Sequence, residues 1–140
     1  MTRNKIYDCI TFFDENLLVN SRFEILKDVV DYFIVCESNY DHKGNKKKIN
    51  FKLQNYKFRD KVRHIVIKEQ FPDLEDGWKC EAYQREKILE GISDAEENDF
   101  IMYSDSDEIP NPFAIKNINL KKKAINLMTA FPNYYFKLFL

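Results

Sequence analysis

Short apolar segments alternate with helical segments from the start of the chain, and this alternation limits the possible folds more than any other feature. Residues 6–13 are apolar, rich in Ile, Thr, Tyr and Phe, and end at a polar stretch, as a buried strand does. Residues 32–36, 62–67 and 100–104 have the same character. Strands that alternate with helices predict right-handed crossovers and an α/β fold, with a doubly wound, mostly parallel sheet and helices on both faces.

Helices are expected between these strands. Ser21 and Glu24 have the spacing of a capping box, so the first long helix is expected to begin there. Residues 78–92 have helical periodicity, and residues 51–58 are expected to hold one short helix.

The last part of the chain has a different pattern. Residues 120–131 are compatible with a helix, and residues 134–140 resemble a strand that runs to the end of the sequence. Nothing after such a strand is left to cover it, so either a partner chain covers it or the sequence is a fragment of a longer protein. With 140 residues, the chain fits a single domain over residues 1–140.

Charge and cysteine content exclude several classes of function. The formal net charge of −1 produces no global field that would attract nucleic acid or an anionic membrane. The basic run of Lys43 and residues 46–48 is either a solvated loop or a local binding patch. Cys9, Cys36 and Cys80 are odd in number and widely spaced, which argues against a disulfide framework or a zinc site.

No stretch approaches the roughly 18 apolar residues that a membrane span requires. The first residues also lack the apolar core of a signal peptide, so a cytoplasmic location is expected.

An acidic motif follows the last predicted strand. Asp105, Asp107 and Glu108 come directly after apolar residues, at the carboxyl end of that strand, where open α/β sheets bind ligands. Residues i and i+2 of an extended chain point the same way, so Asp105 and Asp107 could converge on one Mg²⁺ or Mn²⁺ ion. The alternative is a solvated turn, or an N-cap for the segment after Pro112.

Arg85 is a second candidate. Helical geometry places it within a stripe of apolar residues that are expected to face the core: Trp78, Ala82, Leu89 and Ile92. A guanidinium there needs an anion, which could be the carboxylate of Glu37 or Asp105, or a ligand phosphate beyond the strand ends. A third possibility is that the side chain extends past the core to solvent. Glu37 itself closes the second strand and could hydrogen-bond a ribose or a base.

Three stretches also occur in the same order in one enzyme family. They are residues 6–15, 35–45 and 104–110. These stretches resemble glycosyltransferase family 17, which includes the β-1,4-mannosyl-glycoprotein β-1,4-N-acetylglucosaminyltransferases. The resemblance runs from about residue 5 to residue 138 and implies a GT-A fold. Family members are usually longer, so the chain is expected to correspond to their N-terminal half.

The resemblance also implies roles for individual residues. Asp105 and Asp107 match the metal-binding acids, and Asp105, Arg85 and Glu37 are expected to contact the donor. The expected donor is a nucleotide-diphosphate sugar, UDP-N-acetylglucosamine, used with Mn²⁺ or Mg²⁺ and a glycan acceptor. No residue is identified as the catalytic base. Glu108 could be that base or could orient the metal ligands.

Two other functions fit part of the pattern. Haloacid-dehalogenase-like phosphatases also place an Asp-x-Asp motif after a strand, but near the start of their chain. A shortened domain could instead bind a nucleotide or a partner protein without turnover. Release of phosphate, or binding without sugar transfer, would separate these alternatives from a glycosyltransferase.

Overall fold

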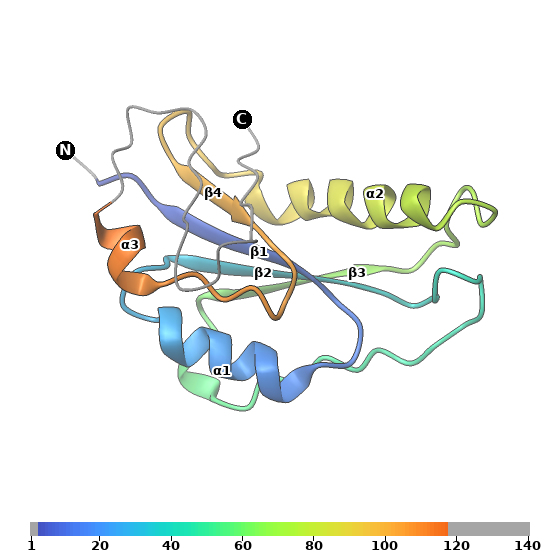
Figure 1. Cartoon of the computed structure of the whole chain (residues 1–140), viewed down its shortest axis with the longest axis horizontal. Helices are drawn as coiled ribbons and strands as arrows, with labels where there is room; N and C mark the ends of the chain where they lie inside the picture. The colour runs from blue at the N-terminus through green and yellow to red at the C-terminus, as the bar shows by residue number, and fades with distance from the viewer. Residues whose placement is uncertain (1–2, 118–140) are drawn as a thin grey trace.

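The computed structural model describes residues 3–117, which form an open sheet of four parallel strands (Figure 1). The strands are β1 (Ile6–Phe12), β2 (Tyr32–Ser38), β3 (Val62–Ile67) and β4 (Phe100–Tyr103). Their order across the sheet is β3-β2-β1-β4, and each neighbouring pair is parallel. The predicted α/β fold with a parallel sheet is therefore confirmed.

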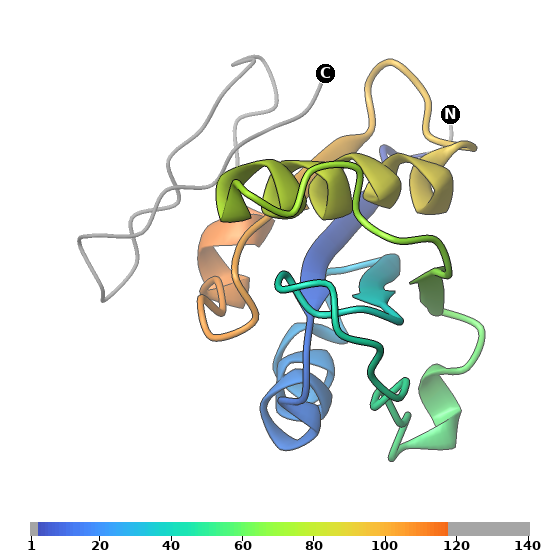
Figure 2. The ribbon, with the colours of Figure 1, turned by 90° about the vertical axis from the view of Figure 1, so that its right-hand side faces the viewer.

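Helices cover both faces of this sheet. Helix α1 (Asn16–Leu26) connects β1 to β2 and lies on one face. Helix α2 (Gly77–Lys87) continues as the 3-10 helix η2 (Ile88–Ile92) and lies on the other face, as the end view in Figure 2 shows. Two short elements complete the described chain: the 3-10 helix η1 (Tyr56–Phe58) and helix α3 (Pro112–Lys116).

Two apolar layers hold the helices to the sheet. Alternate side chains of β1 face opposite sides, because successive residues of a strand point in opposite directions. Ile10 and Phe12 pack with α1 residues such as Phe23, whereas Tyr7 and Cys9 belong to the layer under η2. Burial of these apolar side chains supplies the main driving force for folding.

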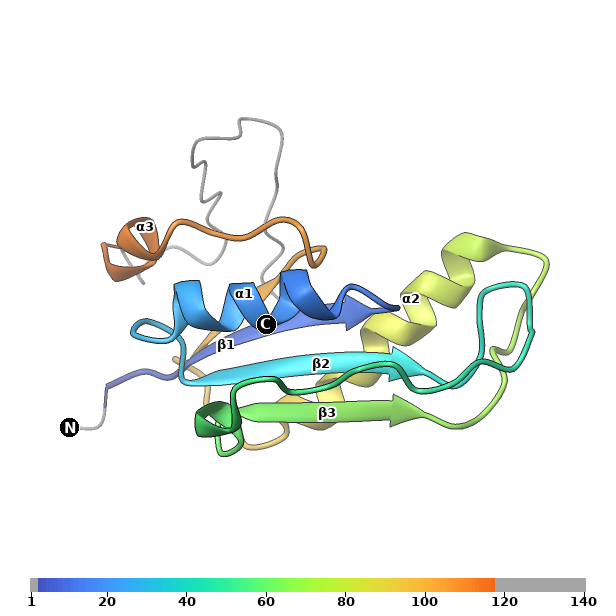
Figure 3. The same ribbon diagram turned by 90° about the horizontal axis from the view of Figure 1, so that it is seen from below.

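The order of the strands creates a topological switch point. The chain proceeds from β1 to β2 to β3 in one direction, and β4 then pairs with the other side of β1. In Figure 3, the arrowheads of β1, β2 and β3 point the same way, toward the loop after β2 and the start of α2. Open α/β sheets bind ligands at the carboxyl edge beside such a reversal, here between β1 and β4.

The capping-box prediction for the first helix is wrong. Helix α1 begins at Asn16, and Ser21 lies inside it, where its hydroxyl donates to the Leu17 carbonyl at 2.8 Å. A serine in the middle of a helix can bond back to the preceding turn in this way, so its presence does not mark a helix start. Glu24 instead accepts a hydrogen bond from the Asn55 side chain at 2.7 Å.

The predicted core face of the second long helix is wrong for Trp78 and Leu89, although Ile92 is buried as expected. Trp78 is 81% exposed and Leu89 is 54% exposed, whereas Cys80, Gln84 and Ile88 face the sheet. A polar contact holds this orientation, because the Gln84 side-chain amide donates to the Cys36 carbonyl at 3.0 Å. With Cys80, Gln84 and Ile88 on the buried side, Trp78 and Leu89 lie on the solvent side.

Other predictions have mixed outcomes. The short helix expected within residues 51–58 is limited to η1. All three cysteines are buried and free. No helix within residues 3–117 is long and apolar enough to cross a bilayer. The helix expected at residues 120–131 and the strand expected at residues 134–140 lie outside the described residues.

Candidate functional site

A tight turn of acidic residues follows β4, and we refer to residues 105–108 as the acidic turn. The Glu108 amide donates to the Asp105 carbonyl at 3.0 Å, which closes a β-turn. The extended geometry expected for this segment is therefore wrong. Asp105 and Asp107 are nevertheless both exposed, while Ser106 between them is only 9% exposed. The turn thus presents both aspartates to solvent.

Two side chains tie the acidic turn to its surroundings. The Glu108 carboxylate accepts a hydrogen bond from the Asp105 amide at 3.1 Å, so it faces back into its own turn. The Ser106 hydroxyl donates to Glu15 at 2.9 Å. Glu15 follows β1, so this bond joins the ends of the two strands that flank the switch point. For Glu108, the geometry favours an orienting role over that of a base.

A buried guanidinium lies beneath the acidic turn. Arg22 of α1 is 0% exposed, and its Nε and Nη2 donate to the two carboxylate oxygens of Asp8 at 2.8 and 2.7 Å. Its Nη2 also donates to the Ser104 hydroxyl at 2.7 Å. Its Nη1 donates to backbone carbonyls of the turn, at 2.9 Å for Asp105, 3.3 Å for Ser106 and 3.2 Å for Glu108.

The acidic turn lies in a region of negative potential. Partial burial raises the pKa of Asp105, and the charges of Glu81 and Asp107 raise it further, while Arg85 and Arg22 oppose them. Burial likewise raises the pKa of Glu108, with additional contributions from the two aspartates. Carboxylates that raise one another's pKa are stabilised by a nearby cation.

The donor set of the turn fits a hard divalent cation. Neither Asp105 nor Asp107 accepts a side-chain hydrogen bond from any described residue, so both carboxylates are free to coordinate. Carboxylate oxygens are the ligands that Mg²⁺ and Mn²⁺ prefer. Within residues 3–117, no group of three or more His, Cys, Asp or Glu side chains could enclose a metal ion. Further ligands at this turn would therefore come from outside residues 3–117.

Arg85 belongs to α2, and its side chain lies against the end of β4. Its Nη2 donates to Glu81 at 2.8 Å, and its guanidinium lies 4.9 Å from the centre of the Tyr103 ring. Its Nε has no hydrogen-bond partner among the described residues. The structural pairing expected with Glu37 or Asp105 is thus replaced by one with Glu81, a neighbour on the same helix.

Glu37 is buried and fully occupied by protein contacts. Its side chain is 0% exposed and accepts hydrogen bonds from the Lys47 ammonium, the Asn50 and Phe51 amides and the His64 ring, at 2.6 to 3.1 Å. Burial alone would raise its pKa, but these hydrogen bonds outweigh burial and lower it. Any influence of Glu37 on a ligand therefore passes through the loop that it anchors.

A pocket of about 470 Å³ opens at the carboxyl edge of the sheet. It is lined by the end of β1 and the residues after it, by the loop after β2 and by one residue of α2: Thr11, Phe12, Phe13, Glu15, Asp41, His42, Lys43 and Gln84. Glu15 connects this carboxyl-edge pocket to the acidic turn through Ser106. Lys43 of the basic run lines the pocket, whereas Lys47 is paired with Glu37.

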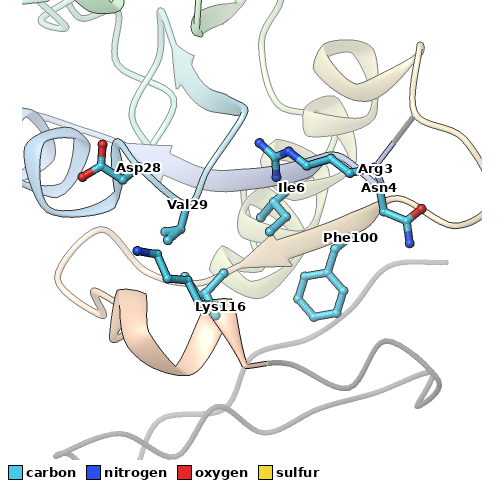
Figure 4. A pocket seen from close by; sticks show the side chains of 8 residues that line it. Arg3, Asn4, Ile6, Asp28, Val29, Phe100 and Lys116 are labelled. Carbon is cyan, nitrogen blue, oxygen red and sulfur yellow. The ribbon is translucent and has the colours of Figure 1, made fainter. Parts of the chain in front are cut away.

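A second cavity, of about 290 Å³, lies at the opposite edge (Figure 4). It is bordered by Ile6 and Phe100, the first residues of β1 and β4, and by α3. It is therefore remote from the acidic turn and is not part of the candidate site.

Arg22 is not among the site residues predicted above, although the sequence holds a signal for its burial. Asp8 is an acid within an otherwise apolar strand, and a buried acid requires a partner. Arg22 is spaced three residues after Val19 and four before Leu26, on the buried stripe of α1. Together these observations indicate that both side chains are buried, but which partner each takes depends on how α1 packs on the sheet.

Comparison with known proteins supports the resemblance noted above. Residues 1–136 match Glycosyltransferase family 17. The chain is 33% identical over 117 residues to the Beta-1,4-mannosyl-glycoprotein 4-beta-N-acetylglucosaminyltransferases of Rattus norvegicus and Homo sapiens, and 32% identical to that of Mus musculus. Each match covers 76% of this chain and 22% of the relative, so the chain spans less than a quarter of those proteins. No solved structure has significant similarity to it.

Proposed function

The chain belongs to glycosyltransferase family 17, and we propose that it binds a nucleotide-diphosphate sugar at the carboxyl edge of its sheet for metal-assisted sugar transfer. The names of the relatives describe transfer of N-acetylglucosamine to a mannosyl glycoprotein. These names support UDP-N-acetylglucosamine as the donor and a glycan as the acceptor. The parallel sheet with helices on both faces is compatible with a GT-A fold.

One observation carries this proposal. The carboxyl-edge pocket, of about 470 Å³, and the exposed acids of the turn are joined by the hydrogen bond between Glu15 and Ser106. A pocket of several hundred cubic ångströms is within the range of small-molecule sites. A nucleoside in the pocket would therefore direct its diphosphate toward Asp105 and Asp107.

The aspartates would hold a divalent cation between the chain and the diphosphate. A bound Mn²⁺ or Mg²⁺ neutralises charge on a diphosphate leaving group. Asp105 and Asp107 bring carboxylates to that position without hydrogen bonds that coordination would have to break. Glu108 keeps the turn closed through its bond to the Asp105 amide.

Two further residues contribute less directly. Arg85 is proposed to bind a donor phosphate, because its guanidinium lies at the end of β4 and its charge acts on Asp105. Glu37 is proposed to support the donor site by anchoring the loop after β2, part of which lines the carboxyl-edge pocket.

A second candidate function is donor binding without turnover. It concerns the 140-residue chain by itself, which spans 22% of the relatives that it matches. It predicts Mn²⁺-dependent UDP binding with no release of sugar. The phosphatase alternative receives no support from the family match.

Calorimetry with UDP tests the binding proposal. We expect the 140-residue chain to bind UDP more tightly with Mn²⁺ than with EDTA, and the Asp105→Ala, Asp107→Ala double variant to lose that difference. A panel of sugar nucleotides with Mn²⁺ would then reveal whether sugar is released and which donor is preferred.

Asp60→Ala is the matched control. Asp60 has a side chain that is 88% exposed, and it precedes β3, at the edge of the sheet opposite the acidic turn. This variant should bind as the wild type does. Equal Mn²⁺-dependent affinity in the wild type and the double variant would remove the aspartates from the site.

A further inference from the structure

The contacts of Arg22 exceed what a buried ion pair requires. A guanidinium and a carboxylate satisfy each other through two parallel hydrogen bonds, and Arg22 forms these with Asp8. The nitrogen that faces away from Asp8, Nη1, donates only to carbonyls of the acidic turn. The remaining contact, with the Ser104 hydroxyl, also leads to the turn, because that hydroxyl donates to the Glu108 carbonyl at 3.1 Å.

These contacts determine which way the acidic turn faces. The carbonyls of Asp105, Ser106 and Glu108 all point inward to the guanidinium of Arg22. Without that donor, such a cluster of carbonyls would be unfavourable away from water. With its carbonyls directed inward, the turn carries the side chains of Asp105 and Asp107 on its exposed side.

Asp8 makes this arrangement possible. A buried guanidinium is costly without a counter-charge, and Asp8 on β1 supplies that charge from within the sheet. Because Asp8 pairs in register with Met102 of β4, the guanidinium is held close to the strand that leads into the turn. The position of the turn is thereby fixed relative to the centre of the sheet.

We propose that Arg22, held by Asp8, is a positioning residue that keeps the acidic turn in the shape that binds the divalent cation and the donor diphosphate. This inference rests on the function proposed above. It assigns to a residue that is inaccessible to solvent the task of orienting the residues that contact ligand.

A double variant separates positioning from plain structural support. Arg22→Met alone leaves Asp8 buried and unpaired, so it should lose both stability and Mn²⁺-dependent UDP affinity. Combining Asp8→Val with Arg22→Met removes both charges, and apolar replacement of a buried ion pair commonly preserves or restores stability. The three carbonyls of the turn would still lack the guanidinium, and that of Ser106 would lose the donor that Arg22 supplies.

We expect the double variant to regain stability toward that of the wild type in thermal unfolding. Its Mn²⁺-dependent UDP affinity should remain about 10- to 100-fold below that of the wild type, which is typical for loss of a residue that orients metal ligands. Hydrogen exchange of the Glu108 amide, which closes the turn, should be faster, while exchange within β1 and β2 should be unchanged.

If the double variant recovers wild-type affinity as well as stability, the proposal is overturned, because Arg22 would then serve only to neutralise the charge of Asp8. Unchanged exchange at Glu108 would also overturn it. Ser104→Ala removes one contact of the guanidinium together with the hydroxyl's own bond to the Glu108 carbonyl, and it should cause a smaller effect in the same direction, even if the double variant fails to fold. If the wild type does not bind UDP with Mn²⁺, the proposed function fails. The exchange rate of the Glu108 amide, compared between wild type and double variant, then tests by itself whether Arg22 keeps the turn in shape.

Discussion

Glu37 is a buried carboxylate whose hydrogen-bond partners all follow it in the sequence. The ammonium of Lys47, two backbone amides and the ring of His64 surround it. A buried charge is tolerated only when such partners replace water. The loop after β2 is therefore folded around the charge at the end of its own strand.

The variant Glu37→Gln should destabilise the chain by about 1–3 kcal/mol at neutral pH. The side-chain NH₂ group of Gln would replace one carboxylate oxygen, and it cannot accept the hydrogen bonds that this oxygen accepts. The pKa of Glu37 is lowered in the folded state from its ordinary 4.5. Its stabilising contribution is therefore complete above about pH 4.5 and is lost as the pH falls through the folded-state value.

Thermal unfolding at several pH values checks this prediction. The difference between wild type and variant should shrink on acidification. Glu97→Gln, at an exposed position of the loop before β4, provides the control and should leave stability unchanged. A difference that persists undiminished at acid pH would show that the charge of Glu37 is not its source.

Sequence alone could identify Asp105 and Asp107 but not the group beneath them. Polar residues directly after an apolar strand predict exposure, whereas the pairing of Asp8 with Arg22 depends on how α1 packs on the sheet. Glu37 likewise looked available for a ligand, because its partners come from a loop without regular structure.

At the scale of elements, the close approach of η2 to the sheet depends on one glycine. A Cβ atom added at Gly91 would lie 2.5 Å from the Ile34 Cγ2 atom. Gly91→Ala should therefore force η2 away from β2 and lower stability by about 1–3 kcal/mol.

Circular dichroism during thermal unfolding measures this change. Gly77→Ala is the matched control, because Gly77 belongs to the same helical segment and an added Cβ there meets nothing within 4 Å. The control should be as stable as the wild type or slightly more stable. Equal losses in both variants would contradict the explanation by close packing.

The elements differ in how far their sequences predict them. The bounds of β3 agree with the predicted residues 62–67, because β-branched residues begin and end the strand and lysines flank it on both sides. The orientation of α2 could not be predicted in this way. Its buried face includes the polar Gln84, whose bond to the Cys36 carbonyl is visible only in three dimensions.

At the scale of the whole molecule, the reversal of strand order brings residues from distant parts of the chain to one edge. The alternation of strands and helices predicted the parallel sheet, but not that β4 pairs with β1. Strand order depends on packing between helices and sheet, which periodicity does not encode. Glu15 and Ser106 meet only because of that pairing.

Donor binding should consequently stabilise the whole fold. A ligand that binds only the folded state at 100 times its Kd adds about 2.7 kcal/mol. UDP with Mn²⁺ should therefore raise the thermal midpoint of the wild type, and should have little effect on the Asp105→Ala, Asp107→Ala variant. A similar rise in both proteins would place the ligand elsewhere.

The exposed position of Trp78 has a practical consequence for spectroscopy. It is the single tryptophan of the chain, and 81% of it is accessible to solvent in the folded state. Its indole already experiences an aqueous environment, so its emission maximum should change little when the protein unfolds. A dye or quencher added to the solvent should reach it freely, which makes it a local reporter for the first turn of α2.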